Sequence, residues 1–532
     1  MSTHGGDSAF PKPQPRQSGV RVVLQYTGIP PSWLDKRPSL PSRNWLIFLS
    51  VTSAITGYYI YDRQQCKKIR QEYVDKVQHL SKLPLHSMEL PRKVTVYGCK
   101  WPADEEYDRS IKYFRKYVKV RTMLSGSPMC ELTVVQPILV AAAVDYEMIN
   151  GRRHGDLADR IANDIKKRRR VEVGLDPPPF NPMNLPQMQP EARRARELEG
   201  GIVIVGRPAF KEFMAGLKRG WSDGLEIVDK EERLADILAD DGHFDEVEAE
   251  PAAALNLGDD EPIPTASKLA PSSPMSLFTA PHLKSSTPAP GSSQNESSIP
   301  PHLNAPPAAI PPQPPILLVS YLNHIGLSQI PNMIWEFFNE RPKVRSGAEA
   351  AYRLIVGETC PLRAPSPSIF AEGADAATGP PPAQSHEADA GSPSDIDFDT
   401  AAEAWYKPSV VASFHAEIQK AREAYYAALP PKLATARALA RGTREPTTDE
   451  AAYPPPTEVE LRAERMKKEL RWRADAAGWD VVRPGAPVAW DERFRDVLRV
   501  FVAPSPEREA GFRAQAEEVM GRIRQKEEAE RE

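Results

Sequence analysis

The side chains that most often perform chemistry are few in this sequence and stand far apart. Four cysteines could bind a metal ion or form disulfides, but no pair of them has Cys-x-x-Cys or other metal-ligand spacing. They are Cys66, Cys99, Cys130 and Cys360. We therefore expect no metal site, and the spacing favours four unrelated thiols while leaving a disulfide open.

Two histidines stand where a catalytic base could act. His324 follows a predicted strand, a position where α/β enzymes often carry functional residues, but no carboxylate stands near it in the sequence. His154 follows Arg152 and Arg153 and is expected in a surface turn. The sequence also lacks the GxxxxGK[ST], HExxH and GxSxG motifs. We expect no catalytic, cofactor-binding or metal-binding residue and no cofactor.

The elements that would position such side chains alternate between strand and helix. Continuous apolar or β-branched runs predict strands, and apolar residues three or four positions apart predict helices. The predicted strands lie at 93–97, within 138–149, at 201–205 and at 316–321, and the predicted helices at 107–119, 156–170, 209–217, 330–339 and 347–356. This alternation predicts an α/β domain with a parallel sheet over residues 91–360.

One uncharged run is a candidate for crossing a membrane. Residues 45–61 (WLIFLSVTSAITGYYIY) carry no charge, and as a helix they would reach about 25 Å. Trp45 at one end and tyrosines at the other match the aromatic belts of membrane interfaces. We expect a transmembrane helix here, and the alternative is a buried core helix. Residues 1–44 are rich in basic side chains, like a mitochondrial targeting segment, but basic residues flank the run on both sides and charge leaves its orientation open.

The amino-acid composition of the rest of the chain predicts a linker helix, disordered stretches and a helical C-terminal region. A polar linker helix is predicted over residues 62–90. Proline accounts for 55 of 532 residues, and its clusters predict disorder because such segments bury too little apolar surface to offset the entropy of ordering. The predicted disordered stretches are 171–199, 222–315 and 361–400, and residues 401–532 are predicted to form a charged helical C-terminal region. The net charge of -4 gives no sign of a nucleic-acid binder.

Several segments resemble one protein family when taken as an ordered set. They are LPSRNW at 40–45, PRKVTVYG at 91–98, VDYEMI at 144–149 and GGIVIVGRPAFKEFMAGL at 200–217. In this order and spacing they resemble the 54-kilodalton subunit of the mitochondrial inner-membrane carrier translocase. The resemblance runs from residue 40 to about residue 360, and the C-terminal quarter matches only loosely.

This resemblance implies a non-catalytic subunit that scaffolds the insertion of multispanning carrier proteins into the inner membrane. It also implies a single-pass topology, with residues 1–44 in the matrix and the bulk of the chain in the intermembrane space. The implied partners are the channel subunit of the carrier translocase and the small intermembrane-space chaperones, together with the protease that faces the same space. No nucleic acid is expected among them.

Residues 120–136 depart from the family's pattern, in which YVK would run directly into PILVAAAVDYEM. The hypothesis is that this segment is a retained intron. A valine codon starts with GT, a glutamine codon can be CAG, and Leu132-Thr133 can encode the common branch-point string CTGAC. The alternative is a surface loop, and sequencing the transcript distinguishes the two.

The strand and helix order also resembles the nucleotide-binding half of diacylglycerol and acylglycerol kinases. In those kinases a strand ends in a GGDGT-type loop, where glycines let the backbone approach phosphate and the next helix supplies N–H groups. The matching residues Gly206 to Phe210 (GRPAF) keep one glycine and include Pro208, which has no N–H. A GTGN-like turn is likewise replaced by Asn323 to Leu327 (NHIGL).

These departures favour a degenerate lipid-kinase-like fold that serves as a scaffold. Arg207 could still bind an anion, although a lone arginine is more often a surface residue. The alternative function is a membrane-anchored acylglycerol or diacylglycerol kinase-like enzyme.

Overall fold

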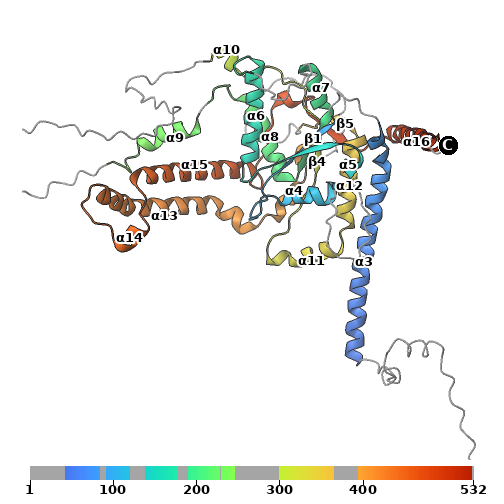
Figure 1. The fold of residues 1–532 in the computed structure, drawn as a ribbon, viewed down its shortest axis with the longest axis horizontal. Coiled ribbons are helices and arrows are strands. Elements are labelled where there is room, and N and C mark those ends of the chain that lie inside the picture. Colours follow the sequence, from blue (N-terminus) through green and yellow to red (C-terminus); the bar gives the residue numbers. More distant parts are fainter. Residues whose placement is uncertain are drawn as a thin grey trace, which may run out of the picture. The chain divides into compact units, whose positions relative to one another are not determined.

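The computed structural model describes residues 42–83, 91–119, 138–177, 190–227, 229–245, 299–364 and 394–529 (Figure 1). The chain divides into two compact units, Met1–Gln65 and Cys66–Glu532. Residues 120–136, for which we raised the retained-intron hypothesis, lie outside the described residues, and so does most of the predicted segment 1–44.

The described part of the first unit belongs to one long helix, α3 (Arg43–Val77), which continues into the second unit. Two helices, at 45–61 and 62–90, were predicted instead, but no proline interrupts residues 43–77 and the helix runs through. Within 45–61 most apolar side chains are exposed, Trp45 by 60% and Phe48 by 58%. No helix among the described residues combines the length and the apolar character needed to cross a membrane.

A six-stranded sheet forms the centre of the second unit, in the order β2-β1-β3-β4-β6-β5. The strands are β1 (Lys93–Gly98), β2 (Asp145–Asn150), β3 (Ile202–Val205), β4 (Ile316–Val319), β5 (Glu358–Pro361) and β6 (Arg499–Val502). Neighbouring strands pair in parallel, except that β5 runs antiparallel to β6. The α/β fold class is therefore confirmed, although the sheet is mixed rather than wholly parallel.

The domain boundaries predicted at residues 360 and 401 were wrong. Strand β6 lies between β4 and β5, so the sheet draws one of its inner strands from the region that we expected to be wholly helical. The four residues of β6 read Arg-Val-Phe-Val, a β-branched and aromatic run that suits a strand. The α/β domain thus extends to the C-terminal part of the chain.

Helices cover both faces of the sheet (Figure 1). Side chains alternate between the faces along each strand, so that Val203 and Val205 point into one apolar core and Ile202 and Ile204 into the other.

The helices of the second unit are α4 (Arg109–Tyr113), α5 (Ile138–Ala141), α6 (Asp156–Glu172), α7 (Pro190–Gly200), α8 (Arg207–Ser222), α9 (Lys230–Ala239), α10 (Pro301–Asn304), α11 (Ile330–Phe338), α12 (Arg341–Val356), α13 (Pro408–Ala440), α14 (Thr448–Ala452), α15 (Glu458–Val482) and α16 (Pro506–Ala529). Shorter helical turns are η1 (Gln78–Lys82), η2 (Phe114–Lys119), η3 (Leu327–Gln329), η5 (Asp395–Asp397), η6 (Thr400–Trp405) and η7 (Glu492–Phe494).

The residues predicted as a polar linker, 62–90, also contribute to the core. Val74 and Val77 near the end of α3 are buried in the same cluster as Val94 of β1. The polar surface of this helix therefore hides a packed face. The end of α3 is part of the domain instead of a spacer.

The predicted disordered stretches contain helices where the structure describes them. Helix α7 falls within 171–199, α9 and α10 fall within 222–315, and η5 falls within 361–400. Both α7 and α9 consist largely of alanine, arginine, glutamate and lysine, which are strong helix formers. Asp229 also caps α9 by accepting from the Glu231 N–H at 2.8 Å. The predictions for 178–189, 246–298 and 365–393 lie outside the described residues.

Helices α13 and α15 form a helical hairpin that extends from the sheet, with α14 at its tip (Figure 1). Its interior holds Tyr425, Leu429, Leu433 and Leu461. Glu469 is fully buried in it and accepts from Arg422 Nε at 2.8 Å and from the Tyr426 hydroxyl at 2.9 Å. The predicted helical C-terminal region is thus present as a packed element, together with α16.

Helices α6 and α8 cross at close range because α8 has glycines at the contact. A Cβ on Gly216 would lie 2.8 Å from the Ala158 carbonyl oxygen and 2.9 Å from Ile161 Cβ. A Cβ on Gly220 would lie 2.8 Å from Ile165 Cβ. These distances are shorter than packed atoms allow, so any larger residue forces the helices apart.

We expect Gly216→Ala to destabilise the second unit by about 1–3 kcal/mol, as overpacking of a close contact does. Thermal unfolding of the full chain in detergent would report this as a lower midpoint. Gly511→Ala in α16 is the matched control, because a Cβ there meets nothing within 4 Å. An unchanged midpoint for Gly216→Ala would contradict the close packing of α6 and α8.

Candidate functional site: the carboxyl edge of the sheet

Open α/β sheets bind ligands beyond the carboxyl ends of the strands, at the point where the strand order reverses. Here that point lies between β1 and β3, since β2 flanks β1 on one side and β4 flanks β3 on the other. The connections that leave this edge begin after Gly98, at Gly206 and after Val319. A site for an α/β enzyme would form where these three connections meet.

The connection after β3 has the predicted strand, glycine and helix order. Gly206 has φ +82° and joins β3 directly to α8. Its N–H donates to the Val319 carbonyl at 2.9 Å, so this donor belongs to the sheet. Pro208 lies in the first turn of α8 and has no N–H to offer. The loop therefore lacks the row of available N–H groups that cradles phosphate, and the likeness to lipid kinases stays a prediction.

Two cations at the start of α8 are neutralised inside the protein. Arg207, 5% exposed, donates from Nε to Glu403 at 2.9 Å and from Nη1 to the Phe398 carbonyl at 2.9 Å. Lys211, 1% exposed, donates to the same Glu403 at 2.6 Å and to the Arg483 carbonyl at 2.9 Å. The expectation that Arg207 is a surface residue or binds an external anion was therefore wrong.

Burial and ion pairing shift the pKa values of Glu403 and Lys211 in opposite directions. Burial raises the pKa of Glu403, but hydrogen bonds from Lys211 and Arg207 outweigh it and hold that pKa below its usual value. Burial lowers the pKa of Lys211, and Glu403 partly offsets the effect. The cluster is therefore one carboxylate shared by a guanidinium and an ammonium group, which suits a structural bridge.

Glu403, which both cations share, and the carbonyl partner of Arg207 belong to residues 394–406, which we call the covering segment. Its Tyr406 packs edge to face on Trp101, with ring centroids 5.1 Å apart, and Trp101 packs in the same way on Tyr321 at 5.5 Å. All three aromatic residues are buried. Because Trp101 follows β1 and Tyr321 follows β4, the covering segment lies across the carboxyl edge.

Two further contacts hold the covering segment in place. Asp399, in the left-handed backbone region at φ +56°, accepts from the Tyr321 N–H at 3.2 Å and from the Ser320 hydroxyl at 2.9 Å. Phe398 packs edge to face on the fully buried Phe210 at 5.9 Å. The place where an α/β enzyme would admit its substrate is thus filled by the protein's own side chains.

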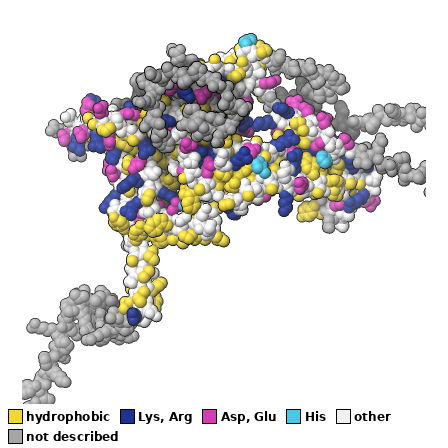
Figure 2. Space-filling model, turned by 180° about the vertical axis from the view of Figure 1, so that it is seen from behind, with side chains coloured by type: hydrophobic (Ala, Val, Ile, Leu, Met, Phe, Trp, Pro, Cys, Tyr) yellow, Lys and Arg dark blue, Asp and Glu magenta, His cyan; other side chains and the backbone are white. Residues whose placement is uncertain are grey.

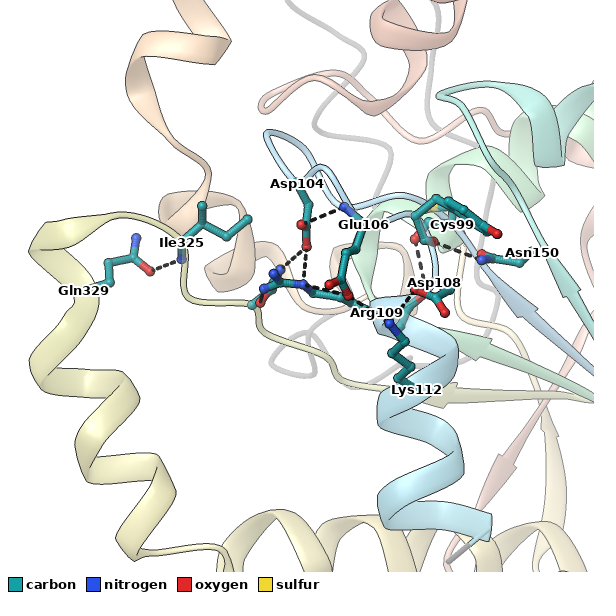
Figure 3. A network of polar contacts seen from close by, with 12 residues as sticks. Cys99, Asp104, Glu106, Asp108, Arg109, Lys112, Asn150, Ile325 and Gln329 are labelled. Atoms are coloured by element: carbon teal, nitrogen blue, oxygen red, sulfur yellow. Dashed lines mark hydrogen bonds and ion pairs between the residues drawn. The ribbon is translucent and has the colours of Figure 1, made fainter. Parts of the chain in front are cut away.

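A polar network joins the connections after β1 and β4 (Figure 3). Asp104 accepts from Arg109 Nε at 3.0 Å and from Asn323 Nδ2 at 2.7 Å. Lys112 on the neighbouring turn pairs with Glu106 at 2.9 Å and with Asp108 at 3.0 Å. Asn323, the first residue of the predicted turn, therefore bonds to protein groups at this edge.

His324 lies in the same connection and is buried. Its Nδ1 is 3.1 Å from Gln329 Oε1, its Nε2 is 3.1 Å from Glu336 Oε1, and its ring packs on Trp405 at 4.8 Å. The fold thus gives His324 a carboxylate partner, which comes from α11, twelve positions away in the sequence. This imidazole links α11 and the covering segment to the sheet.

His154 is not in a surface turn, and this prediction was wrong. It is 7% exposed, and its ring packs on Phe414 at 5.9 Å and on Trp479 at 5.6 Å. Burial lowers its pKa to about 4. Gly478 lies so close that a Cβ would be 1.9 Å from the His154 carbonyl oxygen. This contact is where the helical hairpin docks on the domain.

The N-terminus of α6, another place that could attract an anion, is occupied by Glu212 of α8. Glu212 is fully buried and accepts from the Leu157 N–H at 3.1 Å. Burial raises its pKa to about 8, although backbone N–H groups at Gly155 and Leu157 act against this. The helix terminus is satisfied by a carboxyl group of the same domain.

The cysteines give no sign of a shared site. Cys99 and Cys360 form no disulfide, Cys66 is buried beside Tyr117 and Val344, and Cys130 lies outside the described residues. Burial raises the pKa of the Cys99 thiol well above its usual value, which disfavours thiolate chemistry. Across the described ranges no three His, Cys, Asp or Glu side chains gather as metal ligands.

Cavities among the described residues lie away from the carboxyl edge, and two of them have notable linings. One of about 620 Å³ is at the opposite edge and is lined by Lys93, Thr95 and Ile202 among others. The other, of about 720 Å³, lies between α6, α9 and α15. Arg153, Arg160 and Arg473 are among its lining residues, which makes its wall strongly basic.

Comparison with known protein families shows the family of this chain. A family model described as "Inner membrane protein import complex subunit Tim54" matches residues 22–368. This chain belongs to the Tim54 family. The Tim54 resemblance seen in the sequence motifs is therefore confirmed.

Relatives extend the Tim54 match over nearly the whole chain. A "Mitochondrial import inner membrane translocase subunit TIM54" of Cryptococcus neoformans is 35% identical over 498 residues, covering 93% of this chain and 96% of the relative. Proteins with the same description from Yarrowia lipolytica and Candida albicans are 30% and 28% identical over 281 and 258 residues. They cover 40% and 42% of this chain, and 45% and 58% of their own lengths. The Cryptococcus match is long enough to include most of the C-terminal region.

We expect Glu403→Gln to release the covering segment, because it leaves Arg207 and Lys211 buried with no opposing charge. Breaking a buried pair in this way should cost about 3 kcal/mol or more. Hydrogen exchange over residues 394–406 should rise and the unfolding midpoint should fall. Glu492→Gln, which removes an exposed pair with Arg495, is the control and should change little. Unchanged exchange would disprove the bridging role.

The buried Glu212 predicts a pH dependence. Its pKa rises from the usual 4.5 to about 8 in the fold, so the folded chain keeps a proton that the unfolded chain releases between these values. Stability from this group is present below pH 4.5 and declines as the pH rises towards 8. As the pH rises over this range, the unfolding midpoint of Glu212→Gln should increase relative to that of the wild type. The midpoint of the exposed variant Glu517→Gln should show no such change. A constant difference across pH would refute the assignment.

Proposed function

We propose that this chain is a non-catalytic scaffold subunit of the mitochondrial inner-membrane translocase that inserts multispanning carrier proteins. The observation that carries the proposal is the match to a translocase subunit over 93% of the chain. The covered carboxyl edge supports it, because Glu403, Arg207 and Trp101 fill the place where an α/β enzyme would bind a substrate. No observation favours the lipid-kinase alternative.

The rigid attachment of the hairpin suits a scaffold. Gly478 brings α15 into backbone contact with the domain, and Trp479 stacks on Phe414 with ring centroids 4.5 Å apart. Arg437 pairs with Glu458 at 3.2 Å and ties α13 to the start of α15. A long hairpin fixed at its base presents a surface of constant geometry, on which we place the contacts with the channel subunit and with the small intermembrane-space chaperones.

We further propose that residues 45–61 of α3 anchor the chain in the inner membrane, with the N-terminus in the matrix and the second unit in the intermembrane space. The absence of charge in this run and the exposure of its apolar side chains support the anchor. Trp45 and Tyr61 suit its two ends. The orientation and a contact with the intermembrane-space protease rest on the family resemblance.

Affinity purification of the tagged full chain from digitonin-solubilised mitochondria tests the assignment. The channel subunit of the carrier translocase and the small chaperones should be enriched, because a scaffold stays bound to the assembly it holds. A tagged inner-membrane protein of another complex is the control. Recovery of the chain without the channel subunit would overturn the proposal, and so would ATP-dependent phosphorylation of diacylglycerol or monoacylglycerol by the purified chain.

A further inference from the structure

Helix α11 exposes its apolar side chains and directs its one charged side chain towards the domain. Its sequence IPNMIWEFF is almost wholly apolar, and Trp335 is 64% exposed, Phe337 55% and Ile334 53%. Leu327, in the turn that leads into the helix, is 86% exposed. The one charged side chain of the helix, Glu336, points the other way, towards His324 of the domain. A helix on a water-facing surface would show the reverse arrangement.

This exposure is built into the fold. Glu336 contacts His324 Nε2 at 3.1 Å on one side and Lys343 Nζ at 2.7 Å on the other. Gln329 Oε1 accepts from the Ile325 N–H at 3.0 Å and so fixes the turn before the helix. The two contacts of Glu336 thus tie α11 to the domain, while its large apolar side chains stay exposed.

The apolar surface covers a continuous area. Figure 2 shows hydrophobic side chains gathered along the lower edge of the body, over α11. The exposed members of this patch are Leu327, Ile330, Met333, Ile334, Trp335 and Phe337. Patches of large apolar side chains on a soluble domain mark contact with a membrane or a partner.

The patch lies close to the point where the chain enters the second unit. Cys66, the first residue of this unit, is buried beside Tyr117 and Val344. The Tyr117 hydroxyl donates to Glu340 at 3.0 Å, and Glu340 is the residue that precedes α12, shortly after α11. Residue 61, the end of the proposed anchor, is five residues from Cys66, so chain length keeps it within about 18 Å of this junction.

Basic side chains accompany the patch. Lys116, with its side chain 56% exposed, bonds to Glu340, and Arg345 is exposed on the first turns of α12. Lys343 follows α11 by five residues and pairs with Glu336 of that helix. An apolar face bordered by lysine and arginine is the pattern of helices that lie in the headgroup region of a bilayer with anionic lipids.

We propose that Leu327 and α11 form an interfacial membrane contact, with the apolar face of α11 inserted among lipid headgroups and its axis along the bilayer surface. The inference rests on the proposed anchor, which would keep the junction next to the bilayer. The occupant of the patch is a lipid surface. Together with the anchor it gives the second unit two points of attachment and fixes its tilt on the membrane.

The test places an environment-sensitive dye on α11. Trp335→Cys is made in a full chain in which Cys130 and Cys360 are serine, labelled with a nitrobenzoxadiazole dye, and reconstituted into vesicles of phosphatidylcholine, phosphatidylethanolamine and cardiolipin. The emission should be blue-shifted, and a lipid with a nitroxide high on its acyl chain should remove about half of it, as expected for a side chain at the headgroup boundary. Tyr453→Cys, 85% exposed near the hairpin tip, is the matched control and should respond to aqueous iodide only.

Each result has a separate meaning. A dye at position 335 that responds to iodide and not to the nitroxide lipid, in a chain that resists alkaline carbonate, overturns the proposal for α11 and leaves the anchor intact. A chain released by carbonate overturns the anchor instead. A dye that is shielded in the digitonin-solubilised translocase, but not in vesicles, overturns the lipid contact and assigns the patch to a protein partner.

Discussion

The organisation of the second unit depends on one buried carboxylate. Glu403 binds both Arg207 and Lys211 at the start of α8, and all three side chains are largely withdrawn from water. Neither cation could remain at this depth alone, because desolvation of a charge is compensated only by an opposing charge and good hydrogen bonds. The bridge therefore fixes the covering segment on the sheet, and through it the aromatic contacts of Tyr406, Trp101 and Tyr321.

This constraint connects the fold to the role of a Tim54-family protein. In an enzyme with this topology the carboxyl edge stays open to a substrate, whereas here the same edge is used to join remote parts of the chain. Glu403 also accepts from the Gly485 N–H at 2.9 Å, just beyond α15. The sheet, the covering segment and the base of the hairpin thus share one set of contacts.

The parts of the fold that could be predicted from the sequence are those governed by neighbouring residues. Strand β3 and the Gly206 connection follow from a continuous apolar run and a glycine before a helix. The residues whose burial was wrongly predicted are buried by partners that lie far away in the sequence. Arg207 looked exposed because its partner Glu403 is 196 positions away, and His154 looked exposed because it stands beside two arginines while Trp479 covers it. Helix α7 was missed because proline-rich surroundings outweighed its own helix-forming residues.

The position of β6 has a consequence for how the chain reaches its folded state. Residues 499–502 fill the place between β4 and β5, so the sheet stays split until these residues are present. A chain that emerges from synthesis or crosses a membrane with its N-terminus leading would hold β4 with an unpaired edge until β6 follows, and such edges attract other strands. Helpers that shield nascent chains would be needed until β6 arrives, and a truncation that removes residues 499–502 would leave β4 and β5 unjoined.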